Sequence, residues 1–181
     1  MLDFQKKYLE LILCSGALKF GDFTTKSGRR SPFFIDSGAL SSAQQLFQVA
    51  ELYAQFIHQK LGNDISFLYG PSYKGIPLAI SVSERVSQLL GRDVFFTFNR
   101  KEAKDHGEKG SLVGYQYKGG ESVIIVEDIL TRGTSIRETL EFLKPLAIQP
   151  QAVFIGIDRQ EKGLGENLSA KQELEEEYKV P

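Results

Sequence analysis

Residues 123–135 read Val-Ile-Ile-Val-Glu-Asp-Ile-Leu-Thr-Arg-Gly-Thr-Ser, and this stretch constrains the fold more than any other. The apolar run at 123–126 is typical of a strand buried on both faces, as in parallel sheets. The run stops at Glu127 and Asp128, which predicts both acids at the carboxyl end of the strand, where open α/β sheets bind ligands. The loop 131–135 leads into a helical pattern, so its backbone N–H groups can bind an anion. The acids suit hydroxyls or a metal ion, and the loop suits a phosphate.

Strands and helices alternate along the rest of the chain, which predicts a Rossmann-like α/β fold, a parallel sheet flanked by helices. A basic turn at 26–31 leads into an extended aromatic segment. The helix after the central strand should end near Pro145, and Ser169-Ala-Lys-Gln172 resembles a capping box that opens a last helix. The predicted strands are 66–69, 94–98, 123–127 and 152–157, and the other helical patterns are 3–15, 43–61 and 76–90.

Composition restricts the function classes. The chain has 181 residues, of which 41% are hydrophobic and 25% charged, a balance typical of globular proteins. Its net charge of −1 provides no basic field for nucleic acid. The single cysteine, Cys14, excludes an intrachain disulfide and a multi-cysteine zinc site, and its simplest role is that of a small core residue. With no long apolar stretch and no signal-peptide pattern, we expect a cytoplasmic protein without a membrane partner.

Three polar segments follow predicted strands and should meet at one edge of the sheet. They are the turn at 73–75, the basic run at 100–107 and the acid-and-loop stretch, and Lys26 can join them from the N-terminal segment. Residues 99–120 are either a solvated hairpin or a mobile lid that brings cations onto a polyanionic ligand. Their position directly after a strand favours the lid. Nucleotide-hydrolase and dehydrogenase interpretations are weak because the glycine spacings of those families are absent from the sequence.

The strand, acid pair and Thr/Gly-rich loop resemble the type I phosphoribosyltransferases. Three further stretches are similar to the orotate phosphoribosyltransferase family. These are Phe-Thr-Thr-Lys-Ser-Gly-Arg-Arg-Ser-Pro-Phe-Phe at 23–34, Gly-Pro-Ser-Tyr-Lys-Gly-Ile-Pro at 70–77 and Phe-Asn-Arg-Lys-Glu-Ala-Lys-Asp-His-Gly-Glu at 98–108. The resemblance covers nearly the whole chain. It implies a single domain over residues 1–181, with a small N-terminal hood, mainly residues 1–40, and a catalytic lid at about 99–120.

The reaction implied is the transfer of a phosphoribosyl group from phosphoribosyl pyrophosphate to orotate, with Mg²⁺ held mainly by substrate and water rather than directly by the protein. The partner implied is a second copy of the chain, in a homodimer that shares the lid between subunits. The catalytic residues implied are Arg100, Lys101, Lys104 and His106. Orotate would contact Lys26, the backbone of Phe34 and Ile35, Thr131 and Arg159. Phosphoribosyl pyrophosphate would contact Lys26, Tyr73, Lys74, Arg100, Lys101, Lys104, His106, Glu127, Asp128, Ile129, Leu130, Thr131, Arg132, Gly133, Thr134 and Ser135.

Some features leave alternatives open. Arg159 could bind a ligand carboxylate or form a surface salt bridge with Asp158 or Glu161, and the resemblance favours the ligand. Arg132 stands where the family usually has a small residue, and it could contact the phosphate or point to solvent. The chain stops at Pro181, where relatives usually continue through another strand and helix. A transferase for another nucleobase and a nucleic-acid-binding regulator remain as rival functions, although the 23–34 segment, the lid stretch and the near-neutral charge argue against them.

Overall fold

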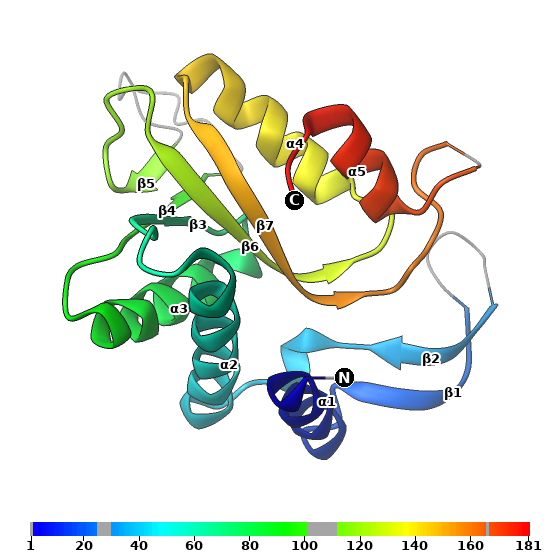
Figure 1. Ribbon diagram of the computed structural model, residues 1–181. Helices are drawn as coiled ribbons and strands as arrows, with labels where there is room; N and C mark the ends of the chain where they lie inside the picture. The colour runs from blue at the N-terminus through cyan, green and yellow to red at the C-terminus, as the bar shows by residue number, and fades with distance from the viewer. Residues whose placement is uncertain (1, 25–29, 101–111, 166) are drawn as a thin grey trace.

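A computed structural model describes residues 2–24, 30–100, 112–165 and 167–181, and its centre is a sheet of five strands (Figure 1). The strand order is β5-β4-β3-β6-β7, and β3, β4, β6 and β7 run parallel. The predicted parallel sheet is therefore confirmed, and the antiparallel edge strand β5 is an addition to it. The strands are β3 (Phe67–Tyr69), β4 (Phe95–Asn99), β5 (Leu112–Gly114), β6 (Ser122–Leu130) and β7 (Gln149–Asp158).

Helices cover both faces of the sheet, as Figure 1 shows. On one face lie α2 (Ala43–Leu61) and α3 (Gly75–Leu90), and on the other lie α4 (Thr134–Leu143) and α5 (Ala170–Tyr178). The capping box predicted at Ser169 is present, because its Oγ accepts a hydrogen bond from the Gln172 amide at 3.2 Å. Among the described residues, no helix combines the length and apolarity that crossing a membrane would require.

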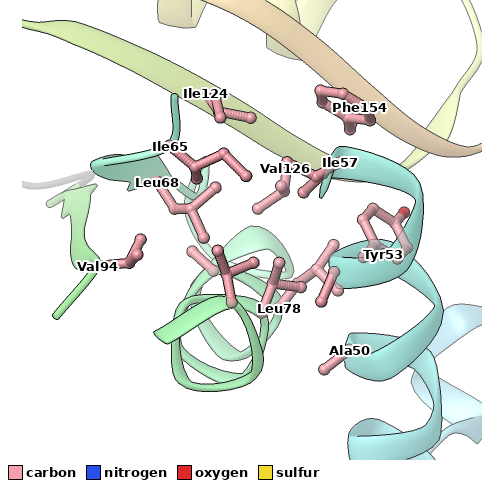
Figure 2. Close-up of a cluster of buried hydrophobic side chains, with 14 of the residues drawn as sticks. Ala50, Tyr53, Ile57, Ile65, Leu68, Leu78, Val94, Ile124, Val126 and Phe154 are labelled. Carbon is pink, nitrogen blue, oxygen red and sulfur yellow. The ribbon is translucent and has the colours of Figure 1, made fainter. Parts of the chain in front are cut away.

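The central strand β6 alternates its side chains between two cores. Ile124 and Val126 point into the core shared with α2 and α3, and both are fully buried (Figure 2). Val123 and Ile125 enter the opposite core, below α4 and α5. Burying each such side chain stabilises the fold by about 1.5–3 kcal/mol. The apolar run at 123–126 is thus explained by burial on both faces, as predicted.

The strand β6 is longer than the sequence predicted. It continues through Glu127 and Asp128 to Leu130, because its parallel pairing with β7 persists as far as the partners Leu130 and Asp158. Glu127, predicted as the last residue of the strand, and Asp128 therefore lie within β6 and are followed by two more strand residues. The loop is correspondingly short, since α4 begins at Thr134.

The N-terminal region forms a separate unit that we call the hood: α1 (Asp3–Cys14), β1 (Leu18–Thr24) and β2 (Arg30–Ile35). The antiparallel β1–β2 pair forms its own sheet, and β1 was not predicted. The helix α1 packs on α2 through stacked rings of Phe4 and Phe56, whose centroids are 4.8 Å apart. In Figure 1 the hood lies beside the carboxyl ends of β6 and β7.

The prediction that Cys14 is a core residue is wrong. Its side chain is exposed at the end of α1, whereas Ile12 on the same helix is 2% exposed. Two residues along an α-helix turn the side chain by about 200°, so a residue two positions from the buried one faces solvent.

Candidate active site

The carboxyl ends of β3, β4, β6 and β7 lie along one edge of the sheet, because the four strands are parallel. The segments after them carry Lys74, Arg100, the 131–135 stretch and Arg159 to this edge. The structure thus brings the 73–75 turn, Arg100 and the 131–135 stretch to one edge, as predicted, whereas the rest of the basic run at 100–107 lies outside the described residues. Four of the predicted site residues, Lys26, Lys101, Lys104 and His106, lie outside the described residues.

Asp128 and Lys74 are linked through a third residue, Ser37. The Ser37 hydroxyl donates a hydrogen bond to Oδ2 of Asp128, and Lys74 Nζ donates to Ser37 Oγ at 3.0 Å. Lys74 Nζ itself is 3.9 Å from Asp128 Oδ2. The Asp128 side chain is 18% exposed and that of Lys74 is 59% exposed. A partly exposed acid and an exposed cation therefore lie close together near the end of β6.

Glu127 has different surroundings from its neighbour. It is 6% exposed, and its Oε2 accepts a hydrogen bond from the Ser135 hydroxyl at 2.7 Å. Burial raises the pKa of Glu127 to about 7, with a smaller contribution from the charge of Asp128. Through its hydrogen bond with Ser135, the Glu127 side chain connects β6 to the first turn of α4.

Two tyrosines, Tyr53 and Tyr8, pack beneath the backbone of the acid pair, on the side of the hood and α2. The Tyr53 hydroxyl, on α2, donates to the backbone oxygen of Glu127 at 2.8 Å. Tyr8, on α1, packs against the Tyr53 ring with centroids 6.2 Å apart, and burial raises the pKa of Tyr8 to about 12. A Cβ at Gly156 of β7 would lie 2.7 Å from the backbone oxygen of Asp128, and 2.3 Å and 2.5 Å from the Tyr8 and Tyr53 hydroxyls, so only glycine fits there. Three elements thus fix the backbone of the acids.

The stretch after β6 has the properties of an anion site. Gly133, at φ +80°, precedes α4, and no described side chain caps the first turn of that helix. Thr131, Arg132 and Thr134 are exposed, so this helix N-terminus is open to solvent. Gly133 packs closely on α5, where a Cβ would come within 3.1 Å of Leu174. Leu130 is buried in the core, so it can offer only its backbone to a ligand.

The turn between β3 and α3 is folded tightly on itself. A Cβ at Gly70 would lie 2.0 Å from the backbone oxygen of Gly75, so the two glycines allow the close approach. The Ser72 amide donates to Asn99 Oδ1 at 3.2 Å, which joins this turn to the end of β4. Tyr73 is 63% exposed. The tight turn therefore presents Tyr73 and Lys74 at the ligand edge.

Arg159 joins the hood to the sheet. Its Nε donates to Glu161 Oε1 at 2.8 Å, so of the two salt bridges considered the one with Glu161 is present. Its Nη2 also donates to Ser31 Oγ at 3.3 Å, and the guanidinium lies 4.6 Å from the centroid of the Phe33 ring. The adjoining residues of β2, Phe34 and Ile35, pair with β1. The backbone of β2 and the Arg159 guanidinium are thereby held close together.

Sequence reasoning missed Ser37, Tyr53 and Asn99. Tyr53 has the helical spacing of an ordinary core residue, so no signal in the sequence distinguished it. Asn99 directly follows an apolar strand, and Ser37 directly follows Asp36 after the aromatic segment. Both are polar residues at strand ends, which is the one signal that could have found them.

The raised pKa of Glu127 predicts a pH-dependent stability. Its ordinary pKa is 4.5, so between about pH 4.5 and pH 7 the folded chain holds a proton that the unfolded chain has lost. Stability should therefore fall as pH rises through this window, by up to about 3 kcal/mol. Glu127→Gln should remove that part of the pH dependence.

Urea unfolding of the wild type and Glu127→Gln at pH 5 and pH 8 measures the difference. Glu121→Gln is a suitable control, because hydrogen bonds from the Lys118 and Gly119 amides lower the pKa of that exposed carboxyl instead. An unchanged pH dependence in Glu127→Gln would contradict the assignment.

Comparison with known proteins agrees with this geometry. The family model of the phosphoribosyl transferase domain matches residues 36–161. The chain is 44% identical over 179 residues to orotate phosphoribosyltransferase of Clostridium acetobutylicum, covering 98% of this chain and 80% of that protein. It is 45% identical over 181 residues to that of Neisseria meningitidis, covering 100% and 83%. The crystal structure of Francisella tularensis orotate phosphoribosyltransferase matches with a TM-score of 0.83 and 33% identity, covering 97% of this chain and 82% of that one.

Proposed function

The chain belongs to the orotate phosphoribosyltransferase family, and from that membership we propose how its own residues transfer the phosphoribosyl group of phosphoribosyl pyrophosphate to orotate. The products of this pentosyl transfer are orotidine 5′-monophosphate and diphosphate, in de novo pyrimidine synthesis. The observation that carries the proposal is the adjacency of Asp128 in β6 to the open N-terminus of α4. An acid beside an anion site suits a sugar that carries a phosphate.

The ribose 5-phosphate part of the donor is assigned to β6 and the start of α4. Asp128 binds a ribose hydroxyl, because it is the more exposed of the two acids. Glu127 acts beneath it and holds the first turn of α4 through Ser135. The backbone N–H groups of residues 131–135 bind the 5′-phosphate. Ile129 and Leu130, which precede them, contribute to the site only through their backbone. Exposed Arg132 adds a cation beside this phosphate.

The diphosphate part is assigned to the cations at the same edge. Tyr73 and Lys74 approach from the β3–α3 turn, and Arg100 approaches from the end of β4. By the family resemblance, Lys101, Lys104 and His106 of the lid complete this set. Breaking the bond between the ribose carbon and the diphosphate leaves an oxocarbenium-like sugar, so catalysis consists mainly of positioning and of stabilising the leaving group's charge.

Orotate is assigned to the space between the hood and the carboxyl end of β7. The guanidinium of Arg159 can pair with the orotate carboxylate, and its contacts with Ser31 and Glu161 hold it beside β2. Thr131 directly follows the end of β6, which pairs with the end of β7. The backbone of Phe34 and Ile35 can bind the ring edge, and Lys26 completes the set by resemblance.

Mg²⁺ fits the described carboxylates as an ion held mostly by substrate and water. This ion keeps several waters and takes one or two carboxylates together with phosphate oxygens. Asp128 is the acid that would meet it, since Glu127 is buried and bonded to Ser135. When bound, Mg²⁺ neutralises charge on the diphosphate.

The lid assignment implies a homodimer in which the lid of each subunit reaches the active site of the other subunit. The lid stretch begins after β4 and returns through β5, which is the outer strand of the sheet. A second copy can therefore approach it from that side. We also propose a cytoplasmic location, where the charged phosphoribosyl donor is retained.

A turnover assay tests the proposed reaction. The purified chain, Mg²⁺ and phosphoribosyl pyrophosphate are supplied with orotate, adenine, hypoxanthine, guanine or uracil in parallel. Diphosphate release with orotate alone is the expected result. Release with a purine instead would indicate a different nucleobase transferase, and RNA or DNA binding without any release would indicate a regulator.

A further inference from the structure

The short helical turn η1 (Ser37–Ala39), between the hood and α2, places a hydroxyl between the acid and the cation of the site. Ser37 Oγ donates to Asp128 Oδ2 and at the same time accepts a hydrogen bond from Lys74 Nζ at 3.0 Å. The three residues come from separate parts of the chain, namely η1, β6 and the β3–α3 turn. Ser37 thus contacts both the proposed ribose ligand and a proposed diphosphate ligand.

The position of Ser37 is fixed by its own turn. The Asp36 side chain accepts a hydrogen bond from the Gly38 amide at 3.1 Å, which caps η1. The Asp36 amide donates to the backbone oxygen of Ala17 at 2.7 Å, which anchors the turn to the hood. The backbone at Ser37 is therefore held in place by contacts that do not involve Asp128 or Lys74.

The distance between the two charges shows what the hydroxyl does. Lys74 Nζ and Asp128 Oδ2 are 3.9 Å apart, which is longer than a charge-assisted hydrogen bond of about 2.7–2.9 Å. A hydroxyl can donate to a carboxylate and accept from an ammonium group at once, so it satisfies both charges without bringing them together. With alanine at this position, the flexible lysine side chain would be free to close on the acid.

We propose that Ser37 is a positioning residue that separates Lys74 from Asp128 and keeps the donor site open. The inference rests on the proposed function, because the ribose and the diphosphate that these two residues bind are joined by the bond that breaks. A direct Lys74–Asp128 pair would occupy the place of that linkage and compete with the donor. Ser37 therefore acts on donor binding and leaves the chemical step and orotate binding unchanged.

Steady-state kinetics of Ser37→Ala, Ser37→Thr and Ser41→Ala tests the proposal. Ser37→Ala should raise the donor KM about tenfold, because the donor must then break the charge-assisted hydrogen bond that forms between Lys74 and Asp128, with kcat and the orotate KM within about twofold. Ser37→Thr, which keeps the hydroxyl, should restore the donor KM. Ser41→Ala, at an exposed serine four positions further along, should match the wild type. If Ser37 only stabilised the fold, Ser37→Ala would lower the unfolding midpoint and would not selectively raise the donor KM.

Calorimetric titration with phosphoribosyl pyrophosphate and Mg²⁺ gives the same comparison without turnover. In a Lys74→Gln background, Ser37→Ala should no longer weaken donor binding, because no cation remains that could pair with Asp128. An unchanged donor affinity in Ser37→Ala, or an equal loss in the Lys74→Gln background, would overturn the role of Ser37. If the wild type binds the donor but does not react with orotate, the proposed function fails while the binding comparison still decides on Ser37. If the wild type does not bind the donor, both are wrong.

Discussion

Asp128→Asn is expected to lower kcat/KM for the phosphoribosyl donor by about 10³-fold, or about 4 kcal/mol of transition-state stabilisation. The substitution keeps the shape of the side chain and its acceptor for the Ile129 amide, which donates to Oδ1 at 2.8 Å. It removes the negative charge that faces the developing positive charge on the sugar. It also removes the charge that the hydroxyl of Ser37 and the Lys74 ammonium face.

Initial rates at varied donor concentration measure this loss. Asp93→Asn, at an exposed carboxyl just before β4, serves as the control and should stay near the wild type. Urea unfolding should show that the folded state of Asp128→Asn is retained. A tenfold loss or less would mean that Asp128 does not face the reacting sugar.

Lys104→Ala is expected to lower kcat by about 10²- to 10³-fold with unchanged folding, because it removes one cation from the leaving diphosphate. Lys109→Ala removes a charge from the same lid stretch without touching the predicted catalytic set, so it is the matched control. Rapid-quench measurement of orotidine 5′-monophosphate formation separates the chemical step from product release. Turnover of Lys104→Ala near that of the wild type would contradict the lid assignment.

Sharing of the lid can be tested with the same two variants. Inactive Asp128→Asn and Lys104→Ala chains are mixed, unfolded and refolded together. If each lid serves the partner's site, every mixed dimer contains one complete site, and the mixture regains about a quarter of wild-type activity. If each lid serves its own subunit, each mixed dimer has two defective sites and no activity returns.

The sequence predicted the layered α/β fold because burial leaves a strong pattern. Helix α2 was predicted with its observed bounds, since a capped amphipathic stretch is set by local rules. The length of β6 could not be predicted, because the two acids interrupt its apolar run, and its pairing with β7 past them leaves no local pattern in the sequence. The strand β1 was missed for a similar reason: most of its side chains are exposed, so burial leaves little pattern.

The candidate site was predictable where its residues are consecutive. The acid pair and residues 131–135 could be predicted directly, because they belong to one strand and to the stretch that follows it. The different surroundings of Glu127 and Asp128 could not, because they depend on Ser135, Ser37 and the packing above Tyr53. These contacts join residues up to 91 positions apart along the chain, and no local pattern records them.

The tyrosine pair beneath the acids has an evolutionary consequence. Tyr8 belongs to the hood, Tyr53 to α2 and Gly156 to β7, and the three fit together only because the glycine has no side chain. A hood taken from a relative must therefore bring a residue at position 8 that matches both partners. Chimaeras that exchange α1 alone should be destabilised where position 8 does not match, and recombination within this family should keep hood and sheet together as one inherited block.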